Sequence, residues 1–219
     1  MKTAMILAAG RGERLRPLTD AIPKALCRVH NVPIIEYHIE KLIQAGVQRI
    51  VINHAHLGGK IRQQVGTGAR WGIEIIYTPE PPGGLETAGG IVNALPWLGT
   101  TPFIAVNADI VTNYSFSTLT LAPEQVAHLV LIKATNTAGR ADFGLSASGH
   151  LRNDDRQYTY SGIACYHPQL FHNRLPGRYS LTPILRDLAH KQQATGEIYE
   201  GTWIDIGSHQ RLQEANQSP

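Results

Sequence analysis

Short apolar runs alternate with segments of helical periodicity along the first 135 residues. The apolar runs predict strands at residues 4–8, 49–53, 73–77, 103–106 and 128–132. Apolar positions three and four residues apart predict helices at 34–45, 57–65 and 87–95. Gly46 directly follows the first of these helices and is its expected C-cap. This alternation is typical of a parallel sheet covered by helices.

The pattern becomes less regular after about residue 135. Shorter strand-like runs occur at 143–145, 159–166 and 202–206, and helical patterns occur at 181–190 and 210–216. We interpret this half as a lid or acceptor-binding lobe folded onto the same sheet. The predicted fold is a single α/β domain of three layers with a mostly parallel central sheet. Such sheets bind their ligands beyond the carboxyl ends of the strands.

Composition narrows the classes of function. The chain has 219 residues, of which 42% are apolar, so it can bury a full-sized core without disulfides. Charged residues make up 17% and the formal net charge is +3, a balance without a strong field of one sign. We therefore expect a small anionic ligand as the partner, and neither a nucleic acid nor a membrane. Apolar runs stay well below the ~20 residues of a membrane span.

The cysteines and the N-terminal segment indicate a cytoplasmic protein. Cys27 and Cys165 are far apart and fit no metal-binding or redox spacing, so we expect two reduced, buried thiols. The first apolar run is too short for a signal peptide and charged residues follow it at once. We read this run as the first strand.

A glycine turn follows the first predicted strand without a break. Gly10 and Gly12 allow backbone N–H groups to turn toward an anion, so the two glycines alone are as compatible with a phosphate-binding loop as with a plain tight turn. The loop lacks the Gly-Lys-Ser/Thr of a Walker A motif. A dinucleotide-binding fingerprint requires a third glycine where Leu15 stands. Both of these familiar phosphate motifs are therefore excluded.

Four cationic residues surround this turn. They are Arg11, Arg14, Arg16 and Lys24. A triphosphate requires several cations, whereas a single arginine or lysine is usually a solvated surface charge. We expect some of the four to bind phosphate and the others to be solvated.

The stretch LAAGRGERLRPLT at 7–19, followed by Pro23 and Lys24, resembles the signature of the sugar-1-phosphate nucleotidyltransferases. The resemblance implies their Rossmann-like nucleotide-diphospho-sugar transferase fold, with about 1–135 binding the nucleotide and about 136–219 the sugar phosphate. It implies that Arg14 and Lys24 are catalytic and polarise the phosphates. The nucleotide-binding residues that it implies are Ala8, Ala9, Gly10, Arg11, Gly12, Glu13, Arg14, Lys24, Gly84 and Glu86. Ala25 departs from the second proline that many relatives carry, a change we expect to be harmless.

Two aspartates stand at the ends of apolar strands. Asp109 follows the strand at 103–106, and Asp205 lies within the apolar run at 202–206. Mg²⁺ binds one or two carboxylates together with phosphate oxygens and water. An N-cap or an ion pair is the alternative role for Asp205. In the family, the acids at both positions jointly hold the metal, so the resemblance assigns Asp109 and Asp205 to Mg²⁺.

Further segments resemble the base-binding and sugar-binding parts of the family. The loop at 79–90 resembles the segment against the base, although it is about one residue longer. The residues that the resemblance places at the sugar phosphate are Asn107, Asp142, Ser161 and Gly162. Asp142 alone is equally typical of a turn. His54 and His56 have no partners at zinc-binding spacing, so we expect no zinc site.

The resemblance further implies UTP as the donor and N-acetylmuramic acid 1-phosphate as the acceptor, with UDP-N-acetylmuramic acid and pyrophosphate as products of cell-wall recycling. GTP with mannose 1-phosphate, and UTP or dTTP with glucose 1-phosphate, remain open. So does a different class, a nucleotide-sugar sensor without catalysis. A cation is expected at the lactyl carboxylate of muramate, and the candidates are Arg140, Arg152, Arg156 and Arg178. The sequence leaves the oligomeric state open.

Overall fold

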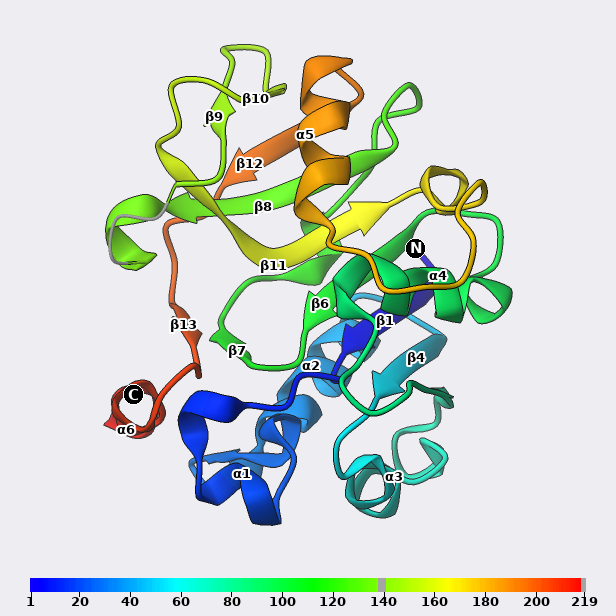
Figure 1. Ribbon diagram of the computed structural model, residues 1–219, viewed down its shortest axis with the longest axis vertical. Helices are drawn as coiled ribbons and strands as arrows, with labels where there is room; N and C mark the ends of the chain where they lie inside the picture. Colours follow the sequence, from blue (N-terminus) through cyan, green and yellow to red (C-terminus); the bar gives the residue numbers. More distant parts are fainter. Residues whose placement is uncertain (138–140, 218–219) are drawn as a thin grey trace.

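A computed structural model describes residues 1–137 and 141–217 of the chain (Figure 1). Seven strands form one sheet in the order β12-β8-β11-β6-β1-β4-β5. Their bounds are β1 Thr3–Leu7, β4 Arg49–His54, β5 Glu74–Pro79, β6 Phe103–Asn107, β8 Ala127–Lys133, β11 Tyr158–Tyr166 and β12 Ala194–Ile198. β11 pairs antiparallel with both of its neighbours, and the other pairs are parallel. The sheet is therefore mixed but mostly parallel, as predicted.

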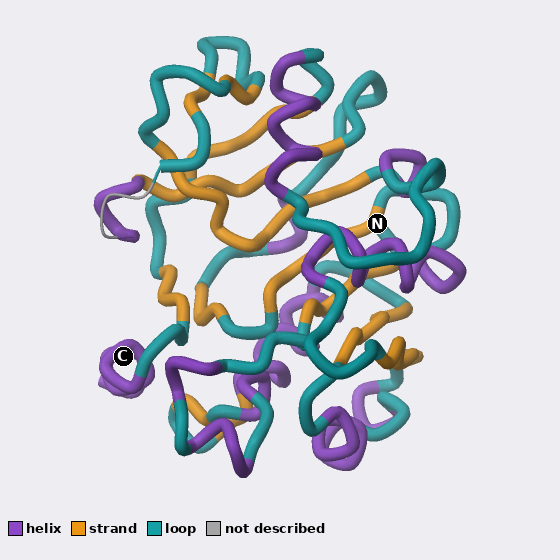
Figure 2. Tube along the Cα trace, in the orientation of Figure 1, coloured by secondary structure: helices purple, strands orange, loops and turns teal. Residues whose placement is uncertain are grey.

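Helices and short ladders complete the fold, and their distribution along the chain is seen in Figure 2. The α-helices are α1 Leu18–Ala21, α2 Ile34–Gln44, α3 Gly58–Val65, α4 Glu86–Leu98, α5 Thr182–His190 and α6 His209–Gln217. Within residues 1–137 and 141–217, three two-stranded ladders lie outside the main sheet: β2 Arg28–Val29 with β3 Val32–Pro33, β9 Gly144–Leu145 with β10 Leu151–Arg152, and β7 Ile110–Thr112 with β13 Trp203–Asp205. Among the described residues, no helix combines the length and apolar character needed to cross a membrane.

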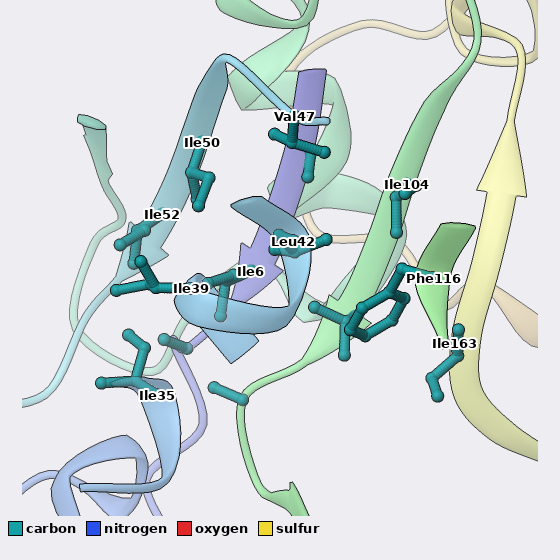
Figure 3. Packing of buried hydrophobic residues seen from close by; sticks show 14 of the residues in the cluster. Ile6, Ile35, Ile39, Leu42, Val47, Ile50, Ile52, Ile104, Phe116 and Ile163 are labelled. Carbon is teal, nitrogen blue, oxygen red and sulfur yellow. The ribbon is translucent and has the colours of Figure 1, made fainter. Parts of the chain in front are cut away.

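Alternating strand residues separate the core into two layers. In β1, Ala4 and Ile6 pack with α2 and α3, while Met5 faces α4 and α5 on the other side of the sheet. Figure 3 shows the first layer, where Ile39 of α2 lies near Ile52 of β4. Helices thus cover both faces, which gives the predicted three-layer architecture.

The expected elements of the first half are present, with ends shifted by a few residues. Gly46 has a φ of 81° and its N–H bonds to the Ile43 carbonyl, so it ends α2 as predicted. The strands and helices expected in the second half also form. β12 and β7 were not predicted, and β12 joins the main sheet at its edge.

The topology brings distant residues to one edge. The parallel strands β1, β4, β5 and β6 all end at the carboxyl edge of the sheet. The β7–β13 ladder then places Asp205 opposite Ile110, and the N–H of Ile206 donates to the Asp109 carbonyl at 2.8 Å. Both aspartates therefore lie at this edge, although 96 positions separate 109 from 205.

Candidate active site

A cavity of about 750 Å³ opens at the carboxyl ends of β1, β4, β5 and β6. Its lining comprises Leu7, Ala9, Gly10, Arg11, Glu13, Asn53, Ala55, His56, Glu80, Pro82, Gly83, Gly84, Glu86, Thr87, Asn107 and Asp109. A volume of this size accommodates a nucleotide-sized ligand. Eight of the residues predicted to bind ligands or metal contribute to this lining.

The glycine loop is held in shape by its own backbone. Gly12 has a φ of 72°, in the left-handed region that favours glycine. Its carbonyl accepts hydrogen bonds from the Thr19 hydroxyl at 2.8 Å and from the Leu15 N–H at 3.0 Å. A Cβ at Gly12 would lie 2.9 Å from Thr19 Cγ2 and 3.3 Å from Lys24 Cβ. Glycine at this position therefore lets the loop pack directly against Lys24.

The arginines of the loop differ in their contacts. Arg11 lines the cavity while its guanidinium donates to the Thr19 carbonyl at 2.7 Å and pairs with Asp20. Arg16 is exposed and pairs with the same carboxylate at 3.0 Å and with Glu13 at 3.8 Å. The hydrogen bond from Arg11, helped by Arg16, holds the pKa of Asp20 below its ordinary value. Arg16 is thus a solvated surface charge, and Arg11 both shapes the loop and faces the cavity.

Lys24 stands between the two predicted metal ligands. Its ammonium pairs with Asp109 Oδ2 and lies 3.6 Å from Asp205 Oδ1. The lysine side chain is only 12% exposed, so these charges interact with little screening. Arg14 approaches from outside, with its guanidinium 4.0 Å from Asp205 Oδ2. A Cβ on Gly207 would lie 2.7 Å from that guanidinium, so this glycine leaves room for Arg14.

The Asp205 carboxylate is the member of this cluster whose hydrogen bonding is incomplete. Its Oδ1 is buried and accepts no hydrogen bond from the described residues. Burial raises the pKa of Asp205, the charge of Asp109 raises it further, and Lys24 and Arg14 oppose the shift. Two converging carboxylates, one of them with an unsatisfied buried oxygen, form a donor set that fits a hard divalent cation. Among the described residues there is no group of three or more metal-binding side chains.

Asn53 and Glu80 form a buried bridge that the sequence analysis missed. The Asn53 amide donates to Glu80 Oε1 at 2.6 Å, and its carbonyl oxygen accepts from the Ala8 N–H at 2.8 Å. Glu80 Oε2 accepts from the Leu85 N–H at 2.7 Å. The bridge thus connects the glycine loop to the loop before α4 across the cavity floor. A polar residue at the end of an otherwise apolar strand was the available signal for Asn53.

Of the predicted sugar-binding residues, Ser161 and Gly162 lie on β11, Asn107 ends β6, and Asp142 lies just before β9. Gly162 has a φ of 86°, and a Cβ there would lie 2.6 Å from the Asn107 side-chain nitrogen, so Asn107 and Gly162 are brought together. Ser161 is buried, and its carbonyl accepts from the Trp203 indole at 2.9 Å. Asp142 accepts a hydrogen bond from the Tyr160 N–H at 3.0 Å. Of these residues, Asn107 lines the cavity.

The loop before α4 forms the opposite wall of the cavity. Gly83 and Gly84 have φ values of 93° and 71°, and Glu86 has a φ of 60°, uncommon for a residue with a side chain.

His56 also lines the cavity, and its Nε2 lies 2.9 Å from the Thr19 carbonyl oxygen. This contact indicates that His56 positions the glycine loop.

The arginines considered for an acceptor carboxylate differ in their surroundings. Arg152 pairs with Asp154 and Asp155 beside the β9–β10 hairpin. Arg156 donates to the Asn153 carbonyl at 2.7 Å. Arg178 pairs with Glu86 of the cavity wall. Arg140 lies outside the described residues.

A three-layer α/β fold with a glycine loop, a largely buried lysine and paired carboxylates at one edge of the sheet is typical of phosphate-handling, nucleotide-binding proteins. The chain belongs to the nucleotidyl transferase family, which matches it over residues 3–218. This membership confirms the family resemblance drawn from the loop motif.

Two curated relatives match over nearly the full chain. An N-acetylmuramate alpha-1-phosphate uridylyltransferase from Neisseria meningitidis serogroup B is 44% identical over 97% of this chain and 96% of its own length. A protein of the same name from Caulobacter vibrioides is 32% identical over 95% and 93% of the two chains. These relatives are named for small nucleotide and sugar-phosphate substrates.

The fold has counterparts among solved structures. HddC from Yersinia pseudotuberculosis, in complex with GMP-PN, superposes with a TM-score of 0.78 and covers 99% of both chains at 19% identity. Identity at this level supports the shared fold alone.

Proposed function

We propose that this chain transfers a uridylyl group from UTP to N-acetylmuramic acid 1-phosphate, giving UDP-N-acetylmuramic acid and pyrophosphate in the recycling of peptidoglycan. The observation that carries the proposal is the Lys24 ammonium held between Asp109 and Asp205 beside a glycine-loop cavity. The choice of donor and acceptor rests on the relative that is 44% identical over 97% of the chain.

The proposed chemistry requires charge neutralisation and alignment, and no covalent enzyme intermediate. A phosphate oxygen of the sugar 1-phosphate attacks the α-phosphorus of UTP, a new P–O bond forms, and the bond to the bridging oxygen of the leaving pyrophosphate breaks. A phosphate monoester has a second pKa of about 6, so the nucleophile is already ionised at neutral pH and needs no general base. Lys24 and Arg14 hold the phosphates in line and offset the charge that develops on the leaving group.

The two carboxylates are the proposed metal ligands. Asp109 and Asp205 would hold Mg²⁺, which accepts a site of one or two carboxylates completed by phosphate oxygens and water. When bound, the ion supplies positive charge against the mutually repelling phosphates. The unsatisfied Oδ1 of Asp205 supports this role. The Lys24 ammonium lies 3.6 Å away, beyond hydrogen-bonding distance, so this buried carboxylate oxygen is left without a donor.

The proposal assigns the two parts of the chain different ligands. Residues of about 1–135, including Ala8 to Arg14 of the glycine loop, Lys24, Gly84 and Glu86, bind the nucleotide. Residues of about 136–219, with Asn107 from the first part, bind the sugar phosphate through Asp142, Ser161 and Gly162. Both cysteines are free, which agrees with catalysis in the reducing cytoplasm where UTP is available.

Pyrophosphate release tests the proposal. Purified protein with Mg²⁺ is assayed with UTP, GTP, dTTP and CTP, each against the 1-phosphates of N-acetylmuramate, glucose, N-acetylglucosamine and mannose. We expect turnover with UTP and N-acetylmuramate 1-phosphate, dependent on the metal. Lys24→Ala should lower kcat by about a hundredfold or more, because a cation that stabilises transferring phosphates is lost.

Lys191→Ala is the matched control. This exposed lysine pairs with Asp187 on α5 and should leave turnover unchanged. Turnover by another substrate pair would keep the nucleotidyl transfer and replace the acceptor. Full activity of Lys24→Ala, or turnover without any divalent ion, would refute the proposed mechanism.

A further inference from the structure

A loop from the second half of the chain is fixed against the start of α4. The N–H of Tyr179 donates to the Leu85 carbonyl at 3.1 Å, and the Tyr179 carbonyl accepts from the N–H groups of Ala88 at 3.2 Å and Gly89 at 3.3 Å. A Cβ on Gly89 would lie 2.2 Å from the Gly177 carbonyl oxygen, so the two backbones are in direct contact. The backbone on both sides of residue 178 is therefore held in place at the cavity wall.

The Arg178 side chain uses this fixed position to reach the cavity wall. Its Nε donates to Glu86 Oε1 at 3.0 Å, and Glu86 lines the cavity. The two side chains are 65% and 42% exposed, so this ion pair is well solvated. Exposed ion pairs are weak and exchange their partners readily. The backbone of Arg178 is thus fixed, while its guanidinium forms only a weak ion pair. This guanidinium can therefore exchange Glu86 for another carboxylate.

The other described candidates lack this combination. Arg152 is shared by two carboxylates, Asp154 and Asp155, on its own hairpin. Arg156 donates to a carbonyl three residues away, that of Asn153. Neither these arginines nor their partners line the cavity. Among the described candidates, Arg178 is therefore the one that pairs with a residue of the cavity lining, Glu86.

We propose that Arg178 selects acceptors that carry a carboxylate, exchanging Glu86 for the lactyl carboxylate of N-acetylmuramic acid 1-phosphate. This inference rests on the proposed function. N-acetylglucosamine 1-phosphate has the same sugar without the lactyl group, and it leaves the Arg178–Glu86 pair in place. A planar guanidinium binds a carboxylate through two parallel N–H donors, which lysine does not reproduce.

Steady-state kinetics with UTP test the role of Arg178. The wild type, Arg178→Gln, Arg178→Lys and Arg174→Gln are compared with N-acetylmuramate 1-phosphate as acceptor and with N-acetylglucosamine 1-phosphate as second acceptor or competitive inhibitor. Arg178→Gln should raise the KM for the muramate on the order of tenfold with little change in kcat, because binding to an unreactive part of the substrate is lost. Its KM or inhibition constant for N-acetylglucosamine 1-phosphate should stay unchanged.

Two variants provide the comparison. Arg178→Lys should recover part of the lost affinity, because it keeps the charge but not the paired donors. Arg174→Gln removes the same charge from the same loop. Among the described residues, the Arg174 side chain forms no ion pair with a residue of the cavity lining, whereas Arg178 pairs with Glu86, so both acceptors should bind to Arg174→Gln as to the wild type.

The outcomes separate this inference from the proposed function. A wild type that turns over UTP only with another acceptor would overturn the proposed acceptor, and the role of Arg178 with it. A wild type active on the muramate, with Arg178→Gln unchanged or equally impaired toward both ligands, would overturn the inference alone. Direct binding of UDP-N-acetylmuramate and UDP-N-acetylglucosamine, measured by calorimetry, should show the same selective loss in Arg178→Gln without depending on turnover.

Discussion

Lys24 is the side chain on which the charges of the site converge. It faces Asp109 and Asp205 at once, and its position depends on the neighbouring backbone of the glycine loop. Gly12 touches Lys24 where any side chain would intrude, with a Cβ 3.3 Å from Lys24 Cβ. The position of Lys24 therefore depends on Gly12, because a residue with a side chain would not fit there.

Gly12→Ala should destabilise the protein and impair turnover together. The left-handed φ of 72° and the crowding by Thr19 should lower the free energy of unfolding by about 1–2 kcal/mol. Displacement of Lys24 should lower kcat at saturating substrate. Chemical denaturation measures the first effect, and pyrophosphate release measures the second.

Gly10→Ala provides the stability comparison, because a Cβ at Gly10 meets nothing within 4 Å. We expect it to raise the free energy of unfolding by about 0.4–1 kcal/mol, because alanine restricts the unfolded chain. If the two alanine variants were equally stable, the strain attributed to Gly12 would be absent.

At the level of elements, the β7–β13 ladder assembles the paired carboxylates. β7 begins directly after Asp109, β13 ends at Asp205, and Trp203 at the start of β13 donates its indole N–H to the Ser161 carbonyl at 2.9 Å. That carbonyl belongs to the segment of β11 where the strand register shifts between Tyr160 and Ala164. The irregular part of β11 thus supplies an acceptor that fixes the strand bearing Asp205.

Trp203→Phe should raise the Mg²⁺ concentration required for half-maximal activity. The substitution keeps most of the ring and removes the N–H donor, so we expect a loss of about 1 kcal/mol in stability and a looser placement of Asp205. Mg²⁺ titrations at saturating substrates measure the effect. Trp97→Phe, at an exposed tryptophan of α4, is the control. An unchanged Mg²⁺ requirement in Trp203→Phe would show that the ladder holds Asp205 without this bond.

Strands with a strong apolar pattern could be predicted from the sequence, and strands without such a pattern could not. β1 and β4 are buried on both faces and read as continuous apolar runs. β12 has the sequence Ala-Thr-Gly-Glu-Ile, in which a glycine and a glutamate interrupt the pattern, so pairing with β8 determines its structure. β7 has only three residues and forms because β13 returns to pair with it.

The residues of the candidate site likewise fall into those that the sequence predicted and those that it did not. Residues of the loop motif and the two aspartates were predicted from motifs that resemble those of the family, in which Asp109 follows an apolar strand and Asp205 lies within one. The Asn53–Glu80 bridge and the Arg178–Glu86 pair join segments 27 and 92 residues apart. Such pairs depend on the fold as a whole, and local pattern carries no information about them.

At the scale of the whole molecule, a buried histidine, His38, makes the free energy of unfolding depend on pH. His38 lies on α2 within the core, is 1% exposed, and neither ring nitrogen has a hydrogen-bond partner of ordinary geometry among the described residues. Burial lowers the pKa of His38 from 6.5 to about 4, against smaller opposing contributions from the Ile110 backbone and Asp109. The folded protein therefore keeps this ring neutral where the unfolded chain would protonate it.

Acidification should weaken the fold through this residue. Above pH 6.5 the His38 contribution to stability is fully present, and it is lost progressively as pH falls toward 4, because the unfolded state binds the extra proton. A shift from 6.5 to about 4 corresponds to about 3 kcal/mol at about 1.4 kcal/mol per unit.

Denaturation curves between pH 7 and pH 4.5 measure this loss. His38→Leu should reduce the dependence on pH, whereas His172→Gln, at an exposed histidine, should leave it as in the wild type. Equal slopes in His38→Leu and the wild type would assign the acid sensitivity to other groups.

The chain path also determines when the site becomes complete during synthesis. The glycine loop, Lys24 and Asp109 emerge from the ribosome long before β13 and Asp205, which lie close to the point where α6 packs back on the N-terminal segment through bonds between Asn216 and His30. A nascent chain can thus assemble its phosphate-binding loop early and still lack the second carboxylate. Under the proposed mechanism, a prematurely terminated product that ends before residue 205 would lack the second carboxylate and would therefore be inactive.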